Sequence, residues 1–198
     1  YTSGTTGRSK GAMLSHENIL SNAKTLVGSW RFSAKDILIH ALPIFHAHGL
    51  FVAANVSMTV GCRMIFLPKF DAAEVLSLFG KATVMMGVPT FYTRLLDQPG
   101  LDKAACSGMR LFVSGSAPLL ADTHQAFEAR TGHAILERYG MTETCMNTSN
   151  PYEGDRLPGS VGPALPGIVV RVRDAETGGE LAEGDIGMLQ VKGPNVFG

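Results

Sequence analysis

A loop-like sequence near the start of the chain holds the residues best suited to binding phosphate. Residues 2–11 read Thr-Ser-Gly-Thr-Thr-Gly-Arg-Ser-Lys-Gly. Glycine lets backbone N–H groups turn inward without a Cβ in the way, and such a turn forms a concave nest of donors for phosphate oxygens. The hydroxyls add hydrogen-bond donors and Lys10 adds a positive charge. A flexible linker is the alternative, but the paired threonines and the closing Lys-Gly favour a phosphate site.

This loop differs from two widespread nucleotide-binding motifs. The P-loop has Gly before its Lys and Ser or Thr after it, whereas Ser9 precedes Lys10 here and Gly11 follows it. The dinucleotide fingerprint Gly-x-Gly-x-x-Gly does not occur in the sequence. We therefore expect a phosphate site of another kind.

A second candidate motif is Tyr-Gly-Met-Thr-Glu at residues 139–143, directly after a predicted strand. Parallel α/β sheets bind ligands at the ends of their strands. The Tyr139 ring can stack on a base, the Thr142 hydroxyl can reach a phosphate, and the Glu143 carboxylate can hold Mg²⁺. The motif alone is also compatible with an ordinary turn, but together with the first loop it predicts a nucleotide site.

Small residues follow another predicted strand, in the sequence Ser-Gly-Ser-Ala-Pro at residues 114–118. Such residues allow a flat ring to approach the backbone closely, although a plain strand-to-helix turn would have the same composition. A serine hydrolase using Ser114 or Ser116 is disfavoured because Gly-x-Ser-x-Gly is absent around Ser116.

Two histidines, His46 and His48, are two positions apart in Pro-Ile-Phe-His-Ala-His-Gly-Leu. On a strand they would share one face and could ligate a metal. No third histidine or cysteine stands at a matching spacing, which disfavours a metal site. A polar residue of the core or its rim is the other interpretation of both.

Arg94 is an unusual charge within residues 89–96, a predicted helix that follows a strand. Beside a pocket, a guanidinium can hold a carboxylate through two parallel hydrogen bonds. An exposed helix arginine without function is the alternative.

Composition limits the classes of function. The chain has 198 residues, a formal net charge of zero and 45% hydrophobic residues, so it can bury a core and is not suited to nucleic acid. Its three cysteines, Cys62, Cys106 and Cys145, are dispersed, which indicates a reducing compartment with neither a disulfide framework nor a zinc site. No apolar run approaches the roughly 20 residues of a membrane span, and no signal peptide is recognisable. The sequence does not specify an oligomeric state.

Apolar runs alternate with helical patterns along the first three quarters of the chain. We predict helices at residues 16–27, 48–60, 72–81, 89–96 and 119–131, and strands at 37–42, 63–67, 83–88, 110–114 and 134–139. Repeated strand–helix units indicate an α/β fold with a helix-flanked, largely parallel sheet. After a Pro- and Gly-rich stretch at 151–167, strands at 168–173 and 186–192 predict a hairpin that starts a small β-barrel-like subdomain.

Taken together, these motifs resemble those of the acyl-adenylate-forming enzymes, which include acyl-CoA synthetases, luciferases and adenylation domains of peptide synthetases. Residues 2–11 are similar to their phosphate loop, with Ser9 where the family usually has Pro. Residues 139–143 are similar to the motif that supplies a Tyr on adenine, a Thr on the α-phosphate and a Glu on magnesium. His46 matches the histidine of a Pro-x-x-His motif that gates the carboxylate pocket.

Within this superfamily the chain most resembles the malonyl-CoA synthetases, over essentially its whole length. The sequence is similar to theirs at residues 65–70, Ile-Phe-Leu-Pro-Lys-Phe, and at residues 138–144, Arg-Tyr-Gly-Met-Thr-Glu-Thr. The resemblance implies a cytoplasmic acid–thiol ligase that activates malonate or methylmalonate with ATP and Mg²⁺ and transfers the acyl group to coenzyme A. It also implies that Arg94 pairs with the distal carboxylate. Neither nucleic acid nor a membrane is an expected partner.

The same resemblance implies one set of site residues. Nucleotide contacts are expected from Thr2, Ser3, Gly4, Thr5, Thr6, Gly7, Lys10, Gly115, Ser116, Ala117, Pro118, Glu137, Arg138, Tyr139, Gly140, Met141 and Thr142. Catalytic roles are expected for Lys10, His46, Thr142 and Glu143, and substrate contacts for His46, Arg94, Ser114 and Met141. Thr5 and Glu143 are the expected Mg²⁺ ligands.

The resemblance further implies that the chain is a piece of a longer protein, in keeping with its start inside a motif. Residues 1–150 would form part of the nucleotide- and acyl-binding core, and residues 151–198 part of a β subdomain. A preceding segment and a mobile C-terminal domain would lie outside the chain, so we expect the isolated chain to be inactive. The alternatives are a medium-chain or aromatic acyl-CoA synthetase and a non-enzymatic nucleotide-binding module.

Overall fold

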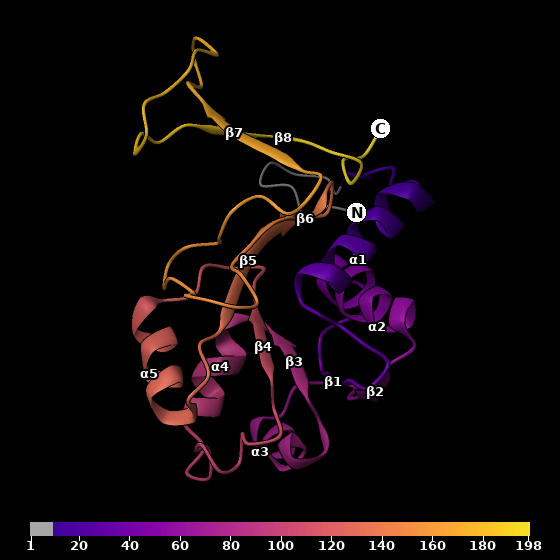
Figure 1. The fold of residues 1–198 in the computed structure, drawn as a ribbon, viewed down its shortest axis with the longest axis vertical. Helices are drawn as coiled ribbons and strands as arrows, with labels where there is room; N and C mark the ends of the chain where they lie inside the picture. Colours follow the sequence, from indigo (N-terminus) through magenta and orange to yellow (C-terminus); the bar gives the residue numbers. More distant parts are fainter. Residues whose placement is uncertain (1–9) are drawn as a thin grey trace.

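A six-stranded sheet forms the centre of the fold in the computed structural model, which describes residues 10–198 (Figure 1). Its strands are β1 (Ile37–His40), β2 (Arg63–Phe66), β3 (Val84–Gly87), β4 (Leu111–Ser114), β5 (Leu136–Met141) and β6 (Cys145–Ser149). They are ordered β2-β1-β3-β4-β5-β6, and each neighbouring pair is parallel except β5–β6. The expected α/β class with a largely parallel sheet is confirmed.

Helices cover both faces of this sheet (Figure 1). One face carries α1 (His16–Ser29), the π-helix η1 (His48–Ala54) and α2 (Asn55–Val60). The other carries α3 (Ala72–Ser77), the 3₁₀-helix η2 (Phe79–Lys81), α4 (Pro89–Leu96) and α5 (Ala121–Thr131). Both faces of β3 and β4 are buried, and these two strands are accordingly apolar runs rather than alternating ones.

Successive side chains of each central strand enter opposite halves of the core, as the pleat of a strand requires. On β1, Leu38 packs towards α1 and η1 while Ile39 packs towards α3. On β4, Val113 and Phe112 divide in the same way, and Phe112 makes an edge contact with Phe127 of α5. The sheet is thereby fixed between two apolar layers, and its strand ends are held in register.

Local signals account for several helix starts. The Ser15 hydroxyl accepts a hydrogen bond from the Asn18 backbone at 3.1 Å, and the Asn18 side chain accepts one from the Ser15 backbone at 2.8 Å, a reciprocal cap for α1. Asp71 caps α3 by accepting from the Glu74 backbone at 2.9 Å. Pro89 occupies the first turn of α4, where its missing N–H costs nothing.

The structure corrects several expected boundaries. The first strand ends at His40 rather than residue 42, α3 ends at Ser77 and continues only as the 3₁₀-helix η2, and α5 begins at Ala121. The predicted helix at 48–60 is present but opens as the π-helix η1. Strand β6 was not predicted; it returns antiparallel to β5 after residues 142–144.

The expected hairpin after the core is confirmed. Strands β7 (Val169–Arg173) and β8 (Met188–Lys192) pair antiparallel as a separate two-stranded sheet. In Figure 1 they lie beyond β6 at one end of the molecule. Several of their side chains are exposed, unlike those of the central strands.

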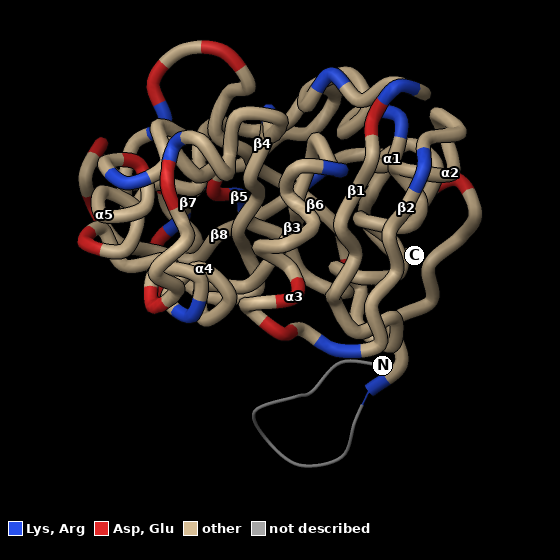
Figure 2. The backbone as a smooth tube through the Cα atoms, turned by 90° about the horizontal axis from the view of Figure 1, so that it is seen from below, with Lys and Arg blue, Asp and Glu red and all other residues tan. Residues whose placement is uncertain are grey.

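Charged positions are interspersed along the outer helices and loops, while the central strands are largely uncharged (Figure 2). Within residues 10–198, no helix combines the length and the apolar character needed to cross a bilayer. The expected cytoplasmic location stays a prediction.

Candidate functional site

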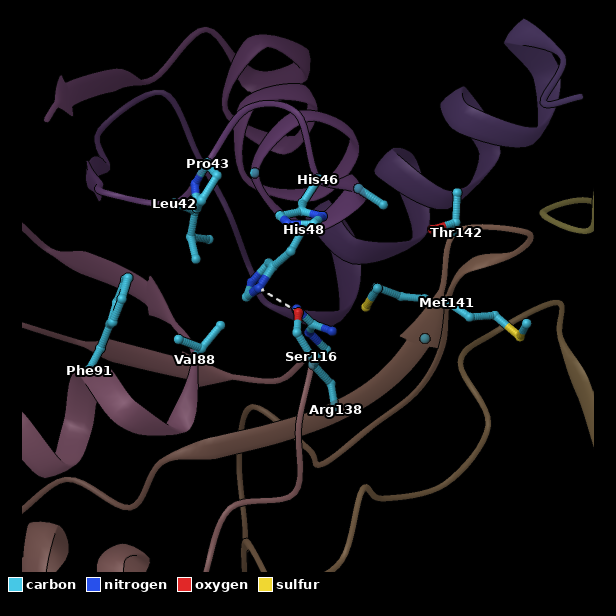
Figure 3. Close-up of a pocket in the computed structure, with 14 residues that line it drawn as sticks. Leu42, Pro43, His46, His48, Val88, Phe91, Ser116, Arg138, Met141 and Thr142 are labelled. Carbon is cyan, nitrogen blue, oxygen red and sulfur yellow. Dashed lines mark hydrogen bonds between the residues drawn. The ribbon is translucent and has the colours of Figure 1, made fainter. Parts of the chain in front are cut away.

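A cavity of about 470 Å³ opens at the carboxyl ends of the parallel strands (Figure 3). The order β2-β1-β3 means that chain order reverses beside β1, and such switch points are where open α/β sheets bind ligands. Leu42 and Pro43 follow β1, Val88 and Phe91 follow β3, and Met146 comes from β6. These residues form the apolar part of the lining.

The polar part of the lining is basic or neutral. It consists of His46, His48, Ser116, Arg138 and Thr142. Among the described residues that line the cavity, none is Asp or Glu. A cavity of this composition attracts anions, because a bound negative charge meets no like charge in the wall.

Arg138 is the fixed positive charge of this cavity. It lies on β5 and is only 3% exposed, and in the described part of the chain neither its Nε nor its Nη2 has a hydrogen-bond partner. Burial lowers the pKa of Arg138 to about 10. A buried, unpaired cation is costly, so an anion entering the cavity would supply interactions that the protein does not provide.

Gly115 leaves room for this guanidinium, while Glu137 lies on the opposite side of the sheet. A Cβ at Gly115, directly after β4, would overlap the Arg138 guanidinium, so a larger residue there would force the guanidinium to shift. Glu137 precedes Arg138 on β5 and therefore faces the other side of the sheet. Its Oε2 accepts a hydrogen bond from the Leu119 backbone at 3.1 Å, near the start of α5. Glu137 thus holds the turn after β4, and it does not line the cavity.

His48, for which the sequence indicated no role, lines the cavity next to Arg138. It is 4% exposed, and its Nδ1 lies 3.3 Å from the Ser116 Oγ (Figure 3). Burial lowers the pKa of His48 well below its ordinary value, and the nearby Arg138 guanidinium and His40 ring lower it further. The imidazole is therefore neutral near pH 7.

Ser116, which contacts His48, has an uncommon backbone conformation. Its φ is +71°, in the left-handed region that residues other than glycine rarely adopt. Such conformations persist where the surrounding structure fixes them, and they concentrate at functional sites. Ser114, two residues earlier, is buried at the end of β4 and does not line the cavity, and Ala117 and Pro118 are exposed outside it.

The motif at 139–143 forms the end of β5 and its turn into β6. A bulge separates Tyr139 from Gly140, and a Cβ at Gly140 would collide with the Cys145 carbonyl oxygen. Gly140, Met141 and Thr142 line the cavity, whereas Tyr139 and Glu143 are half-buried beside it. The strand end thus presents a backbone edge and a hydroxyl to the cavity.

The two spaced histidines have different positions. His46 is exposed at the cavity wall with its ring 4.7 Å from that of Phe45, while His48 is buried in the first turn of η1. His40 is buried on β1 and its Nε2 lies 2.9 Å from the Gly49 carbonyl. No cluster of three or more metal-ligating side chains occurs within residues 10–198.

Arg94 is exposed on α4 and does not line the cavity. Its guanidinium lies 5.2 Å from the centroid of the Phe70 ring, which stacks on Phe91 at 3.8 Å. Because Phe91 lines the cavity, Arg94 is one aromatic pair away from it.

The structure describes only the end of the first loop. Thr2, Ser3, Gly4, Thr5, Thr6 and Gly7 lie outside the described residues, and Lys10 is exposed at their edge. Their expected contacts with phosphate and Mg²⁺ stay predictions. Sequence reasoning missed the apolar lining, although Pro43, just after a predicted strand, marked one part of it.

Comparisons with known proteins fit this arrangement. The family model described as AMP-binding enzyme matches residues 1–198. The structure of ATP-bound MatB from Rhodopseudomonas palustris is 70% identical with a TM-score of 0.97, and the match covers 100% of this chain and 39% of that one. A malonyl-CoA ligase in a ternary product complex with methylmalonyl-CoA and AMP is 38% identical with a TM-score of 0.91, covering 100% and 43%.

A curated relative is also a malonate–CoA ligase. The mitochondrial malonate–CoA ligase ACSF3 of Mus musculus is 39% identical over 231 residues, which covers 100% of this chain and 40% of that protein. The chain spans 32–40% of the length of the curated relatives it matches first.

Proposed function

Because the chain belongs to the AMP-binding enzyme family, we propose that it is the central part of an ATP-dependent ligase that joins malonate to coenzyme A. Support comes from the malonate–CoA ligase of Mus musculus and from the ligase structure that holds methylmalonyl-CoA and AMP. Residues 1–150 supply most of the nucleotide and acyl site, and residues 151–198 begin a β subdomain. The rest of the enzyme comes from sequence flanking this chain.

The reaction has two displacements. A carboxylate resists attack by a thiol, because its charge repels nucleophiles and its oxygen is a poor leaving group. In the first step a carboxylate oxygen of malonate attacks the α-phosphorus of ATP, and pyrophosphate leaves. In the second the thiolate of coenzyme A attacks the carbonyl carbon, and AMP leaves. The first step needs no general base, since the nucleophile is already an anion, so the protein contributes orientation and charge stabilisation.

The observation that carries the choice of malonate is the buried guanidinium of Arg138, which lacks partners at Nε and Nη2. A substrate with a second carboxylate can pair with it through two parallel hydrogen bonds. A fatty or aromatic acid would leave the cation unpaired against an apolar surface, which is unfavourable. The cavity of about 470 Å³ therefore suits a small diacid.

Other residues in and beside the cavity have proposed roles in the same reaction. His46 stands at the cavity wall where the reacting carboxylate enters, and Met141 packs beside the acyl group. Thr142, which follows Met141 at the cavity, donates a hydrogen bond from its hydroxyl to an oxygen of the α-phosphate. Tyr139 stacks on adenine from its half-buried position.

The loop at 2–11, with Lys10, binds the phosphates from the other side. The Glu143 carboxylate is an oxygen ligand of the kind that Mg²⁺ prefers, and Thr5 is its proposed companion. When bound, the ion would offset negative charge on the phosphates.

Arg94 remains a second proposed contact for the distal carboxylate. Its support is the Phe70–Phe91 stack, which connects it to the cavity wall. Its exposure and its place outside the lining make Arg138 the stronger candidate.

A panel of acids tests the proposed function in the complete protein that carries this chain. We expect ATP-dependent thioester formation with malonate, a smaller rate with methylmalonate, and little with propionate, octanoate or benzoate. Propionate is the sharpest comparison, because it resembles malonate in size but lacks the second charge. Equal rates with malonate and propionate would contradict the role of Arg138. Octanoate or benzoate as the best substrate would favour a medium-chain or aromatic acyl-CoA synthetase instead.

A further inference from the structure

His48 is the buried titratable group in the cavity wall that the proposed function leaves without a role. Its Nδ1 lies 3.3 Å from the Ser116 hydroxyl, and its Nε2 is buried without a hydrogen-bond partner among the described residues. Its neighbour Arg138 also has unpartnered nitrogens. Two side chains that line the same cavity thus have buried nitrogens without hydrogen-bond partners among the described residues.

The groups that face His48 from the surrounding elements are basic. Arg138 faces it from β5 and His40 from β1, and the exposed His46 shares the cavity wall. The other elements packed against η1 are α1, α2 and β6, and none of them adds a titratable side chain to the described lining. Within this surrounding the only negative charge near His48 is one that a ligand brings.

We propose that His48 takes up one proton when the distal carboxylate of the acyl substrate docks beside Arg138, which makes it a specificity-determining residue for dicarboxylates. This inference rests on the proposed function. Before binding, the wall holds one cation, Arg138, and a neutral imidazole. After binding, the imidazolium and the guanidinium both face the carboxylate, and the proton comes from solvent.

The electrostatics give the direction. Desolvation and the Arg138 charge keep the imidazole neutral before binding. A carboxylate within a few ångströms offsets the Arg138 charge and attracts the imidazolium directly, and this attraction is strong where water is excluded. Ligand binding therefore raises the pKa of His48, and by linkage the affinity for malonate rises as pH falls towards the value in the complex.

The Ser116 hydroxyl makes both protonation states possible. A hydroxyl is donor and acceptor at once, so it can donate to a bare Nδ1 and accept from a protonated one. Ser116 has a left-handed backbone with φ of +71°, and its hydroxyl lies 3.3 Å from the His48 Nδ1. An acid without a second charge gives no reason for the proton to bind, which is how the pair separates diacids from monoacids.

The test is calorimetric titration of malonate into the complete protein, loaded with a non-hydrolysable ATP analogue. Buffers of different ionisation enthalpy report the protons taken up, at a pH well above the second ionisation of malonate. We expect uptake approaching about one proton per malonate bound. The variant His48→Gln, which keeps a polar side chain, should bind malonate more weakly and without uptake.

Two controls make the outcome specific. His16→Gln changes an exposed histidine on α1 and should leave the uptake as in the wild type. Propionate, if it binds, should take up no proton. Uptake that persists in a folded His48→Gln protein would overturn the inference.

The wild-type measurement decides even if the variant fails to fold. Malonate binding without proton uptake in the wild type would overturn the inference and leave the proposed function standing. Absence of malonate binding at every pH would overturn the proposed function itself.

Discussion

Replacing Arg138 by methionine should stabilise the protein and at the same time remove its activity on malonate. The guanidinium is 3% exposed and unpartnered at Nε and Nη2. Burial lowers its pKa to about 10, and at about 1.4 kcal/mol per tenfold change this shift corresponds to about 3 kcal/mol against the cation. Methionine is unbranched and fills irregular gaps, so we expect the free energy of unfolding to rise by about 1–3 kcal/mol.

The effect on catalysis has the opposite sign. Loss of one partner of a buried, hydrogen-bonded charge pair costs about 2–5 kcal/mol, or roughly 30- to 5,000-fold in kcat/KM for malonate. Urea unfolding of the unliganded protein and steady-state thioester formation measure the two quantities separately. The variant Arg138→Lys should fall between wild type and Arg138→Met, because it keeps the charge without the planar fork.

The matched control is Arg63→Met, which removes an exposed arginine from β2, the edge strand of the sheet. It should alter neither stability nor kcat/KM noticeably. The reasoning is refuted if Arg138→Met keeps a kcat/KM for malonate comparable with that of the Arg63 control. A loss of stability in Arg138→Met would refute the claim that the guanidinium is uncompensated before substrate binds.

Three further predictions follow from the same coordinates. Gly115→Ala should push the Arg138 guanidinium aside and lower kcat/KM for malonate at least tenfold, by about 1.4 kcal/mol or more, which kinetics would show; unchanged kinetics would mean that the contact is not tight. Arg94→Ala should raise KM for malonate if Arg94 reaches the distal carboxylate, and an unchanged KM would end that idea. Burial acts to raise the pKa of Asp36, but its hydrogen bonds, including two from Arg110 at 2.7 and 2.9 Å, hold that pKa below its ordinary value. The stability that Asp36 contributes is therefore complete above about pH 4 and lost as pH falls through the lowered value; Asp36→Asn should cost about 2–4 kcal/mol in urea unfolding near pH 7, and a neutral effect would contradict this.

The order of most helices and strands could be predicted from the sequence, because helix caps and helix-starting prolines act through neighbouring residues and do not depend on tertiary contacts. Ser15 and Asp71 cap helices with their own side chains, and Pro89 starts a helix through its fixed φ. Strand β6 was not predicted, because the turn before it, at residues 142–144, contains no glycine or proline. Cys145 instead adopts a φ of +52°, and its residue type gives no indication of this left-handed conformation. Boundaries shifted where tertiary packing decides, as at the end of α3.

The candidate site was predictable in part only. The family resemblance placed several residues among the expected site residues, and the structure brings six of them to one cavity: His46, Ser116, Arg138, Gly140, Met141 and Thr142. Spacing cannot report burial or missing partners, which depend on residues far away in the chain. Burial and missing partners therefore add Arg138 and His48 as candidates. The contact between Arg94 and the distal carboxylate, which the resemblance implies, stays a prediction.

The position of the second carboxylate of malonate is the central question. A crystal structure of the complete protein with malonate and a non-hydrolysable ATP analogue tests it directly. We expect the distal carboxylate within hydrogen-bonding distance of both Arg138 and His48, with the α-phosphate beside Thr142. Malonate bound away from Arg138, or nucleotide bound away from the turn at 139–143, would contradict this expectation.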